Sequence, residues 1–246
     1  KPLYYADDGE TIRVASQVKA LRAGGAIADA PDPAGHAGFF LLGYVPEPHT
    51  MYRAIKSLPA GTSLRIEAGG QPRIQQYFRL QDQYAGRQAV SAPGEIAERL
   101  RAALTDSIRH HLVADVPVGV FLSAGLDSAT ITALAAEVAG ASLDTMTLRF
   151  DEMAGTPGDE APLAEQIAGH YQTRHQTRSV SGLEFQDHID KVLTAMDQPS
   201  VDGVNTYFVA KEAKALGLKV ALSGVGGDEL FGGYQSFQQI PAYVGA

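Results

Sequence analysis

The sequence predicts an α/β protein whose larger part is a doubly wound parallel sheet, that is, a parallel sheet covered by helices on both faces. Strand-like apolar runs alternate with helix-like segments from about residue 95 onward, which is the pattern of βαβ units. Residues 116–122 are almost continuously apolar, as expected of a strand buried on both faces. Two glycine-rich, acid-bearing turns, at residues 123–128 and 223–228, each follow a strand-like run and open a helix.

The first eighty residues or so predict short strands and turns instead of this alternation. Gly-containing turn signals separate β-favouring runs, and strands are expected at residues 3–6, 11–15, 62–67 and 71–78. A short helix is expected at residues 16–22, and a helical or apolar segment at residues 38–45. The Ala/Pro/Gly-rich residues 28–38 predict a surface loop, and the polar residues 81–94 predict a linker.

Each element beyond this linker has its own signal. Apolar residues recur every fourth position at Ile96, Leu100, Leu104, Ile108 and Leu112, which predicts an amphipathic helix facing a core. After the strand at 116–122, the alternation predicts helices at 126–138, 159–170, 183–196 and 205–216 and strands at 143–150, 174–180 and 218–222.

Composition excludes several classes of protein. The 246 residues carry a net charge of −8, whereas broad nucleic-acid and anionic-membrane surfaces need dense Lys and Arg. The absence of cysteine excludes disulfides, thiolate metal sites and Cys-dependent reactions within these residues. The longest apolar run, residues 38–45, is too short to span a bilayer. A cytoplasmic setting without nucleic-acid or membrane partners is therefore predicted.

The first turn, residues 123–128 (SAGLDS), has the chemistry of a phosphate site. Ser123 and Ser128 offer hydroxyl groups, Gly125 lets backbone amides approach an anion, and the helix that begins near Leu126 adds its positive dipole end. The turn has no lysine, so it is not a Walker loop. It carries Asp127 instead, and a carboxylate beside phosphates requires a cation between them. Mg²⁺ is the expected ion.

The second turn, residues 223–228 (SGVGGD), repeats this chemistry. Ser223 and Gly224 offer a hydroxyl group and backbone amides, and Asp228 supplies a second carboxylate. Ligands of open α/β sheets bind beyond the carboxyl ends of the strands, at the point where strand order reverses. Asp127 and Asp228 are therefore predicted to share the Mg²⁺-bound pyrophosphate group of a nucleotide.

With these two turns the chain resembles the asparagine synthetase family, whose synthetase domain is a PP-loop ATP pyrophosphatase with an SGGxDS loop and a later SGxGxDExFGGY segment. Residues 1–6, 14–21, 43–46 and 58–61 are similar to the closing part of that family's class II glutamine amidotransferase domain. The resemblance implies part of an Ntn-type α+β amidotransferase domain at residues 1–80 and a linker at 81–94. Residues 95–246 would be the N-terminal part of an ATP-binding domain of the adenine nucleotide alpha-hydrolase type.

The activity that the resemblance implies is that of an ATP-dependent amide ligase. ATP activates a carboxylate as an acyl-adenylate with release of pyrophosphate, and ammonia from glutamine then displaces AMP, which converts L-aspartate to L-asparagine. The partners would be ATP, a carboxylate acceptor, and glutamine or ammonia, with Mg²⁺ as the metal. Oligomeric state is left open, with a homodimer as one option.

Residue roles follow from the resemblance by position. The pyrophosphate and Mg²⁺ role falls to Ser123, Gly125, Leu126, Asp127 and Ser128, with Ser223 and Gly224 contacting the nucleotide. Asp127 and Asp228 would be the catalytic and metal-binding acids. Leu122 and Leu148 would line the adenine pocket, although both fit an ordinary core position equally well.

Several departures from the family pattern leave alternatives open. Ala124 replaces the second glycine of the first loop, and Val225 stands where the family commonly has a glutamate. No cation lies between Met196 and Lys211, where aspartate-using members place an arginine. The family's terminal cysteine is absent, so the chain is interpreted as a fragment that is inactive alone. The alternatives are an adenylating enzyme that acts on another carboxylate or forms a lactam, and a non-catalytic nucleotide-binding remnant.

Overall fold

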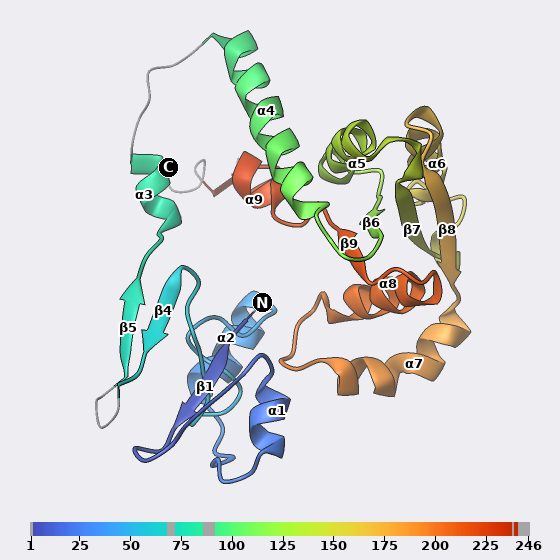
Figure 1. Ribbon diagram of the computed structural model, residues 1–246. Helices are drawn as coiled ribbons and strands as arrows, with labels where there is room; N and C mark the ends of the chain where they lie inside the picture. The colour runs from blue at the N-terminus through green and yellow to red at the C-terminus, as the bar shows by residue number, and fades with distance from the viewer. Residues whose placement is uncertain (1, 68–71, 86–91, 238, 241–246) are drawn as a thin grey trace. The chain divides into compact units, whose positions relative to one another are not determined.

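A computed structural model of the chain describes residues 2–67, 72–85, 92–237 and 239–240 (Figure 1). Contacts between Cα atoms divide the chain into two compact units. Unit 1 comprises Lys1–Val90 and Ile189–Thr206, and unit 2 comprises Ser91–His188 and Tyr207–Ala246. The chain therefore passes between the units three times, and a segment of the C-terminal half belongs to the N-terminal unit.

Unit 1 contains two small antiparallel sheets. Strands β1 (Tyr4–Asp7), β2 (Ile12–Ala15) and β3 (Lys56–Ser57) pair in the order β2-β1-β3. Helix α1 (Val18–Ala23) packs on them, because Val18 and Leu21 are buried with Ala6 and Ile55. Strands β4 (Thr62–Arg65) and β5 (Arg73–Gln76), which lie within the strands expected at residues 62–67 and 71–78, pair antiparallel; residues 68–71 lie outside the described residues.

Helix α2 (Pro33–Leu42) corrects the prediction of a surface loop at residues 28–38. The Asp32 side chain accepts a hydrogen bond from the amide of Ala34 at 3.1 Å, and Pro33 occupies the first helical turn; both favour a helix start. The helix contains two glycines, which usually disfavour helices. Here each glycine lets the helix pack closely against a neighbouring segment. A Cβ at Gly35 would collide with the Thr50 carbonyl, and one at Gly38 with the Pro46 ring.

The predicted amphipathic helix is α4 (Pro93–His111). Its C-terminal half packs as expected, since Ile108 is buried and Leu104 and Leu112 lie against the same cluster. Its N-terminal half does not, because Ile96 and Leu100 are 49% and 40% exposed. The preceding polar stretch, predicted as a linker, contains the short helix α3 (Leu80–Ala85), and its residues 86–91 lie outside the described residues.

Unit 2 is built on a four-stranded parallel sheet of order β8-β7-β6-β9. The strands are β6 (Val118–Phe121), β7 (Asp144–Phe150), β8 (Arg174–Val180) and β9 (Val220–Leu222). Besides α4, the helices are α5 (Leu126–Ala139), α6 (Ala161–His170) and α9 (Gly227–Phe231), together with the first part of α7 (Gly182–Ala195) and most of α8 (Gly203–Ala215). Two 3₁₀ turns, Gly140–Ser142 and Asp151–Met153, flank β7.

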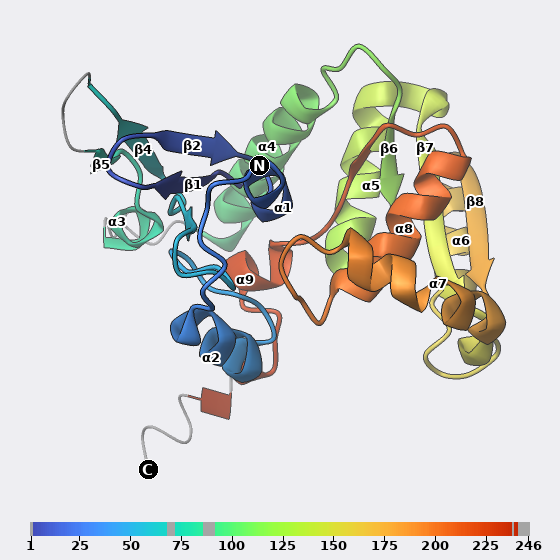
Figure 2. The ribbon, with the colours of Figure 1, turned by 90° about the horizontal axis from the view of Figure 1, so that it is seen from below.

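Helices cover both faces of this sheet, which confirms the predicted doubly wound architecture. Figure 2 shows α8 on the nearer side of the sheet and α5 and α6 behind it. The alternation of side chains along β7 agrees. Thr145 faces the α6 side, where it meets His175, and Phe150, on the other face, contacts the Phe208 ring of α8 with the ring centroids 6.2 Å apart.

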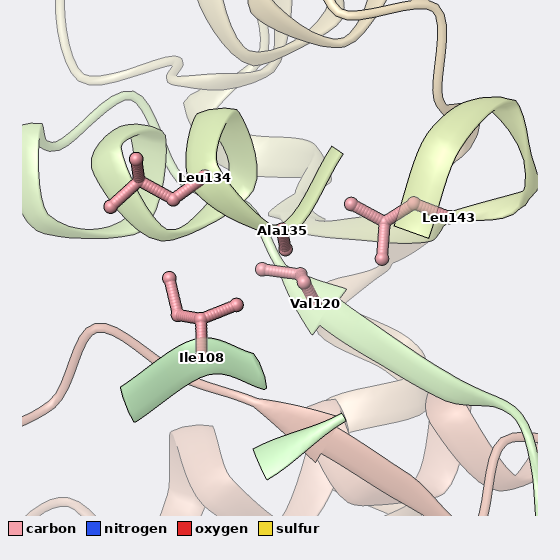
Figure 3. Packing of buried hydrophobic residues seen from close by; sticks show 5 residues of the cluster. All are labelled: Ile108, Val120, Leu134, Ala135 and Leu143. Carbon is pink, nitrogen blue, oxygen red and sulfur yellow. The ribbon is translucent and has the colours of Figure 1, made fainter. Parts of the chain in front are cut away.

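The inner strand β6 is held by a buried apolar cluster (Figure 3). Val120 of β6 and Ala135 of α5 are fully buried, and Ile108, Leu134 and Leu143 complete the cluster. Burial of this kind is the main favourable contribution to folding, so it fixes the strand from which the first predicted turn departs. Across the described ranges, no helix is both long and apolar enough to cross a bilayer.

Candidate nucleotide site

The two predicted turns leave neighbouring strands at the same edge of the sheet. The chain adds β7 and then β8 on one side of β6 and places β9 on the other side, so strand order reverses between β6 and β9. Val118 pairs with Val220 and Val120 with Leu222 in parallel register. The carboxyl end at such a reversal is where open α/β sheets bind ligands, and residues 123–128 and 223–228 both begin there.

The two serines of the first turn bond to each other. Their hydroxyl oxygens lie 2.7 Å apart, and Ser128 Oγ accepts a hydrogen bond from the Ser123 amide at 3.1 Å. Ser128 Oγ also lies 3.0 Å from the Ser123 carbonyl oxygen. Because Ser128 is only 6% exposed, its hydroxyl group stabilises the turn, and Ser123 has the more accessible of the two.

The start of helix α5 leaves backbone amides free to bind an anion. Gly125 is its N-cap residue, with extended backbone and no side-chain hydrogen bond to the helix. The first amides of a helix lack intrahelical partners, and with the helix dipole they favour a negatively charged ligand. Leu126 is 86% exposed, so it contributes its backbone here and no core packing.

The second turn lies directly on the first. A Cβ built on Gly224 would lie 2.9 Å from the Ser128 amide nitrogen and 3.0 Å from Asp127 Cβ. A Cβ on Gly227 would collide with the Asp127 carboxylate. The Asp127 side chain therefore reaches from the first turn to the backbone of the second, and only glycine leaves it this room.

Both predicted acids are available for a ligand. Asp127 and Asp228 are half-buried, and neither carboxylate forms a hydrogen bond or ion pair with another described residue. Asp228 lies in the first turn of α9, with its carboxylate against Gly233. Within the described ranges no three His, Asp or Glu side chains are grouped as a metal site, so a cation here would need further ligands from the phosphates.

Comparison with known proteins gives the family of this chain. The asparagine synthase family model matches residues 99–244, and the glutamine amidotransferase domain model matches residues 1–78. The chain belongs to the asparagine synthase family. Membership confirms the predicted resemblance, and the family's use of ATP agrees with the phosphate chemistry of the two turns.

Several curated members of the asparagine synthase family are similar to nearly the whole chain. Asparagine synthetase [glutamine-hydrolyzing] 1 of Bacillus subtilis is 31% identical over 241 residues, which is 97% of this chain and 37% of that protein. A putative asparagine synthetase [glutamine-hydrolyzing] of Mycobacterium tuberculosis is 34% identical over 246 residues, with the same two shares. Asparagine synthetase B of Escherichia coli is 32% identical over 203 residues, 77% of this chain and 35% of that protein. The chain thus spans little more than a third of the length of these relatives.

The two leucines predicted to line an adenine pocket lie in different surroundings. Leu122 is 2% exposed and packs on Ala164 and Ala168 of α6, so its side chain is part of the core. Leu148 is half-buried near the carboxyl end of β7. Their roles toward a nucleotide stay predictions, and the packing of Leu122 agrees with the ordinary core position considered for it.

Sequence reasoning did not predict which residues contact the two acids. Gly227 and Gly233 contact the carboxylates of Asp127 and Asp228, and Tyr234 donates a hydrogen bond to Glu229 at 3.0 Å. The paired glycines are visible in the sequence. The carboxylate that each one meets is not, because the contact with Asp127 joins distant parts of the chain.

Proposed function

We propose that this chain carries the ATP-binding part of a glutamine-dependent amide ligase, in which the turns at residues 123–128 and 223–228 hold the pyrophosphate group of ATP. The observation that carries the proposal is the position of the Asp127 side chain against Gly227. It brings two anion-binding turns together at the strand-order reversal. Membership of the asparagine synthase family supports ATP as the nucleotide.

Mg²⁺ fits the two acids as the metal of this site. Carboxylate oxygens are ligands that Mg²⁺ prefers, and it commonly combines one or two of them with substrate phosphates. Asp127 and Asp228 have no competing partner among the described residues, and Gly227 and Gly233 leave space beside them. When bound, the ion would neutralise the charge that the acids and the phosphates would otherwise oppose.

The chain's own groups would stabilise the departing pyrophosphate. The open amides at the start of α5 and the Ser123 hydroxyl group would donate hydrogen bonds to phosphate oxygens, in the manner of fixed donors aimed at developing charge. An oxygen of the acceptor carboxylate attacks the α-phosphorus, and the bond to the bridging oxygen of pyrophosphate breaks. Ammonia then attacks the acyl carbon of the adenylate, AMP leaves and an amide remains.

We propose aspartate and glutamine as substrates because the relatives are named glutamine-hydrolysing asparagine synthetases. The proposal keeps the cytoplasmic setting, the small-molecule partners and the optional homodimer predicted from the sequence. One observation favours a second candidate, an adenylating enzyme with another acceptor. Val225, where the family commonly has glutamate, is 90% exposed in the second turn and brings no charge to it.

The decisive experiment measures ATP binding by calorimetry with and without Mg²⁺, together with exchange of label between pyrophosphate and ATP. Asp127→Asn is expected to weaken Mg²⁺-dependent ATP binding by about tenfold or more, as loss of a metal-site group does. Asp115→Asn is the matched control, because this exposed acid precedes β6 at the opposite edge of the sheet. Unchanged Mg²⁺-dependent binding by Asp127→Asn would contradict the proposal.

The same assays separate the candidate functions. Exchange that requires aspartate supports asparagine synthesis. Exchange that requires another carboxylate supports the second candidate. Binding of ATP without exchange, whatever carboxylate is offered, would identify a non-catalytic remnant.

A further inference from the structure

Two pairs of adjacent glycines flank α9, and the first member of each pair is explained by its backbone. Gly226 has φ +100° and Gly232 has φ +69°, values that side chains with a Cβ rarely adopt. Gly227 and Gly233 have no positive φ. Backbone conformation therefore does not account for the second glycine of either pair.

The second glycine of each pair lies against a carboxylate. A Cβ on Gly227 would collide with the carboxylate of Asp127, and a Cβ on Gly233 with that of Asp228. Neither acid is held by a hydrogen bond or ion pair to another described residue. What limits the position of each carboxylate is thus the bare backbone of a glycine.

We propose that Gly227 and Gly233 are positioning residues that act through Asp127 and Asp228 and determine where the two carboxylates present their oxygens. This inference rests on the proposed function and adds to it the residues that set the metal geometry. Gly227 is the sharper case, because its carboxylate comes from the other turn. A side chain there pushes the acid away from the second turn, whereas glycine lets it lie flat on the backbone.

Gly227→Ala tests the proposal with little risk to the fold. The colliding atoms belong to the end of the Asp127 side chain, which can rotate away, and alanine is favoured over glycine in a helix. Mg²⁺-dependent ATP affinity is expected to fall by about tenfold or more, while affinity for ATP without Mg²⁺ stays unchanged and the thermal midpoint does not fall. Gly169→Ala in α6 is the control, since no atom lies within 4 Å of its added Cβ; it makes the same exchange in a helix and should leave Mg²⁺-dependent ATP affinity unchanged.

A double-mutant cycle shows whether Gly227 acts through Asp127. Once Asp127→Asn is in place, Gly227→Ala should cause no further loss, because coupled sites are non-additive. Additive losses, or full Mg²⁺-dependent affinity in Gly227→Ala, would overturn the inference. If Asp127→Asn alone leaves Mg²⁺-dependent affinity intact, the proposed function fails instead, so the two failures are distinguishable.

Asp127→Glu provides a second route if Gly227→Ala does not fold. The added methylene keeps the charge and carries the carboxylate beyond its place on Gly227, so Mg²⁺-dependent affinity should fall as in Gly227→Ala. Wild-type affinity in this variant would show that the contact with Gly227 does not position the acid.

Discussion

Lys19 and Asp197 cap each other's helices. The amides of Val18 and Lys19 at the start of α1 donate to the Asp197 carboxylate at 2.7 and 2.9 Å. Lys19 Nζ in turn donates to the carbonyls of Thr194 and Ala195 at the end of α7, at 2.9 and 3.0 Å. Gln17, the N-cap residue of α1, makes no side-chain bond to it, so an acid distant in the sequence takes that role.

Removal of this reciprocal cap should destabilise unit 1. We expect Asp197→Ala to lower the free energy of unfolding by about 1–2 kcal/mol, the cost of losing a helix N-cap, and Asp197→Asn to cost less because it keeps one acceptor oxygen. Urea unfolding measures both. The control is Asp202→Ala, because Asp202 is an exposed acid of the same unit. An equal loss of unfolding free energy in this variant would contradict the capping role of Asp197.

Low pH should reduce the stability of unit 1 because it protonates Asp32. Burial alone would raise the pKa of this carboxyl, but hydrogen bonds from Lys56, His49 and the Ala34 amide outweigh it and hold the pKa at about 2. The folded state thus favours the ionised form, whose contribution is complete above the ordinary pKa of 3.8 and is lost as pH falls toward 2. Asp32→Asn should flatten the dependence of stability on pH in that window, whereas Asp202→Asn should leave it unchanged.

His175 should make unit 2 sensitive to a milder fall in pH. Burial lowers the pKa of this imidazole, and the charge of Glu165 opposes the shift. The unfolded chain, with a pKa of about 6.5, then binds a proton that the folded state resists, so stability falls as pH drops below that value. Nδ1 and Nε2 lie 3.0 and 3.3 Å from the hydroxyls of Thr145 and Thr177.

His175→Gln tests this, since glutamine can hydrogen-bond but takes up no proton. Urea unfolding at pH 7.5, 6 and 5, values chosen about the ordinary histidine pKa, should give a shallower loss of stability for His175→Gln than for the wild type. His170→Gln, at an exposed position, should keep the wild-type slope. Parallel curves for all three proteins would show that His175 does not titrate as inferred.

The cluster that packs on β6 should be a costly place to remove apolar volume. Leu134 is 3% exposed among Ile108, Val120 and Leu143, and Leu134→Ala is expected to lower the free energy of unfolding by about 2–5 kcal/mol. Leu183→Ala, at a side chain that is 75% exposed, should change it by no more than about 0.5 kcal/mol. Denaturant unfolding of the two variants compares them directly.

Local patterns predicted most of unit 2. The strand expected at residues 174–180 is β8 itself, and the amphipathic spacing around Ile108 gave α4. The two turns are also local signals, because small residues and an acid directly follow each strand. Their meeting was expected from the rule that ligands bind where strand order reverses, and the strand order that places both turns at that point comes from the structure.

Features that depend on distant contacts could not be predicted. The first part of helix α2 was expected as a loop because residues 28–38 are rich in Ala, Pro and Gly, yet Gly35 is needed for close approach to Thr50. Asp197 gives no sign in the sequence that it caps α1. The surroundings of Asp127 are equally hidden, since they depend on which glycine of a remote turn lies beneath its carboxylate.

The assignment of residues 189–206 to unit 1 has a practical consequence for anyone who wishes to dissect this protein. A cut placed near residue 90 would not yield two free-standing pieces, because Asp197, Gln198 and Val201 bond to Val18, Met51 and Gly43 upstream of the cut. A nicked chain should therefore stay associated on a sizing column until denaturant is added. If the downstream piece were expressed alone, Asp197, Gln198 and Val201 would lose these hydrogen-bond partners. The surface that they form with residues upstream of the cut would then be exposed, and we expect that piece to aggregate.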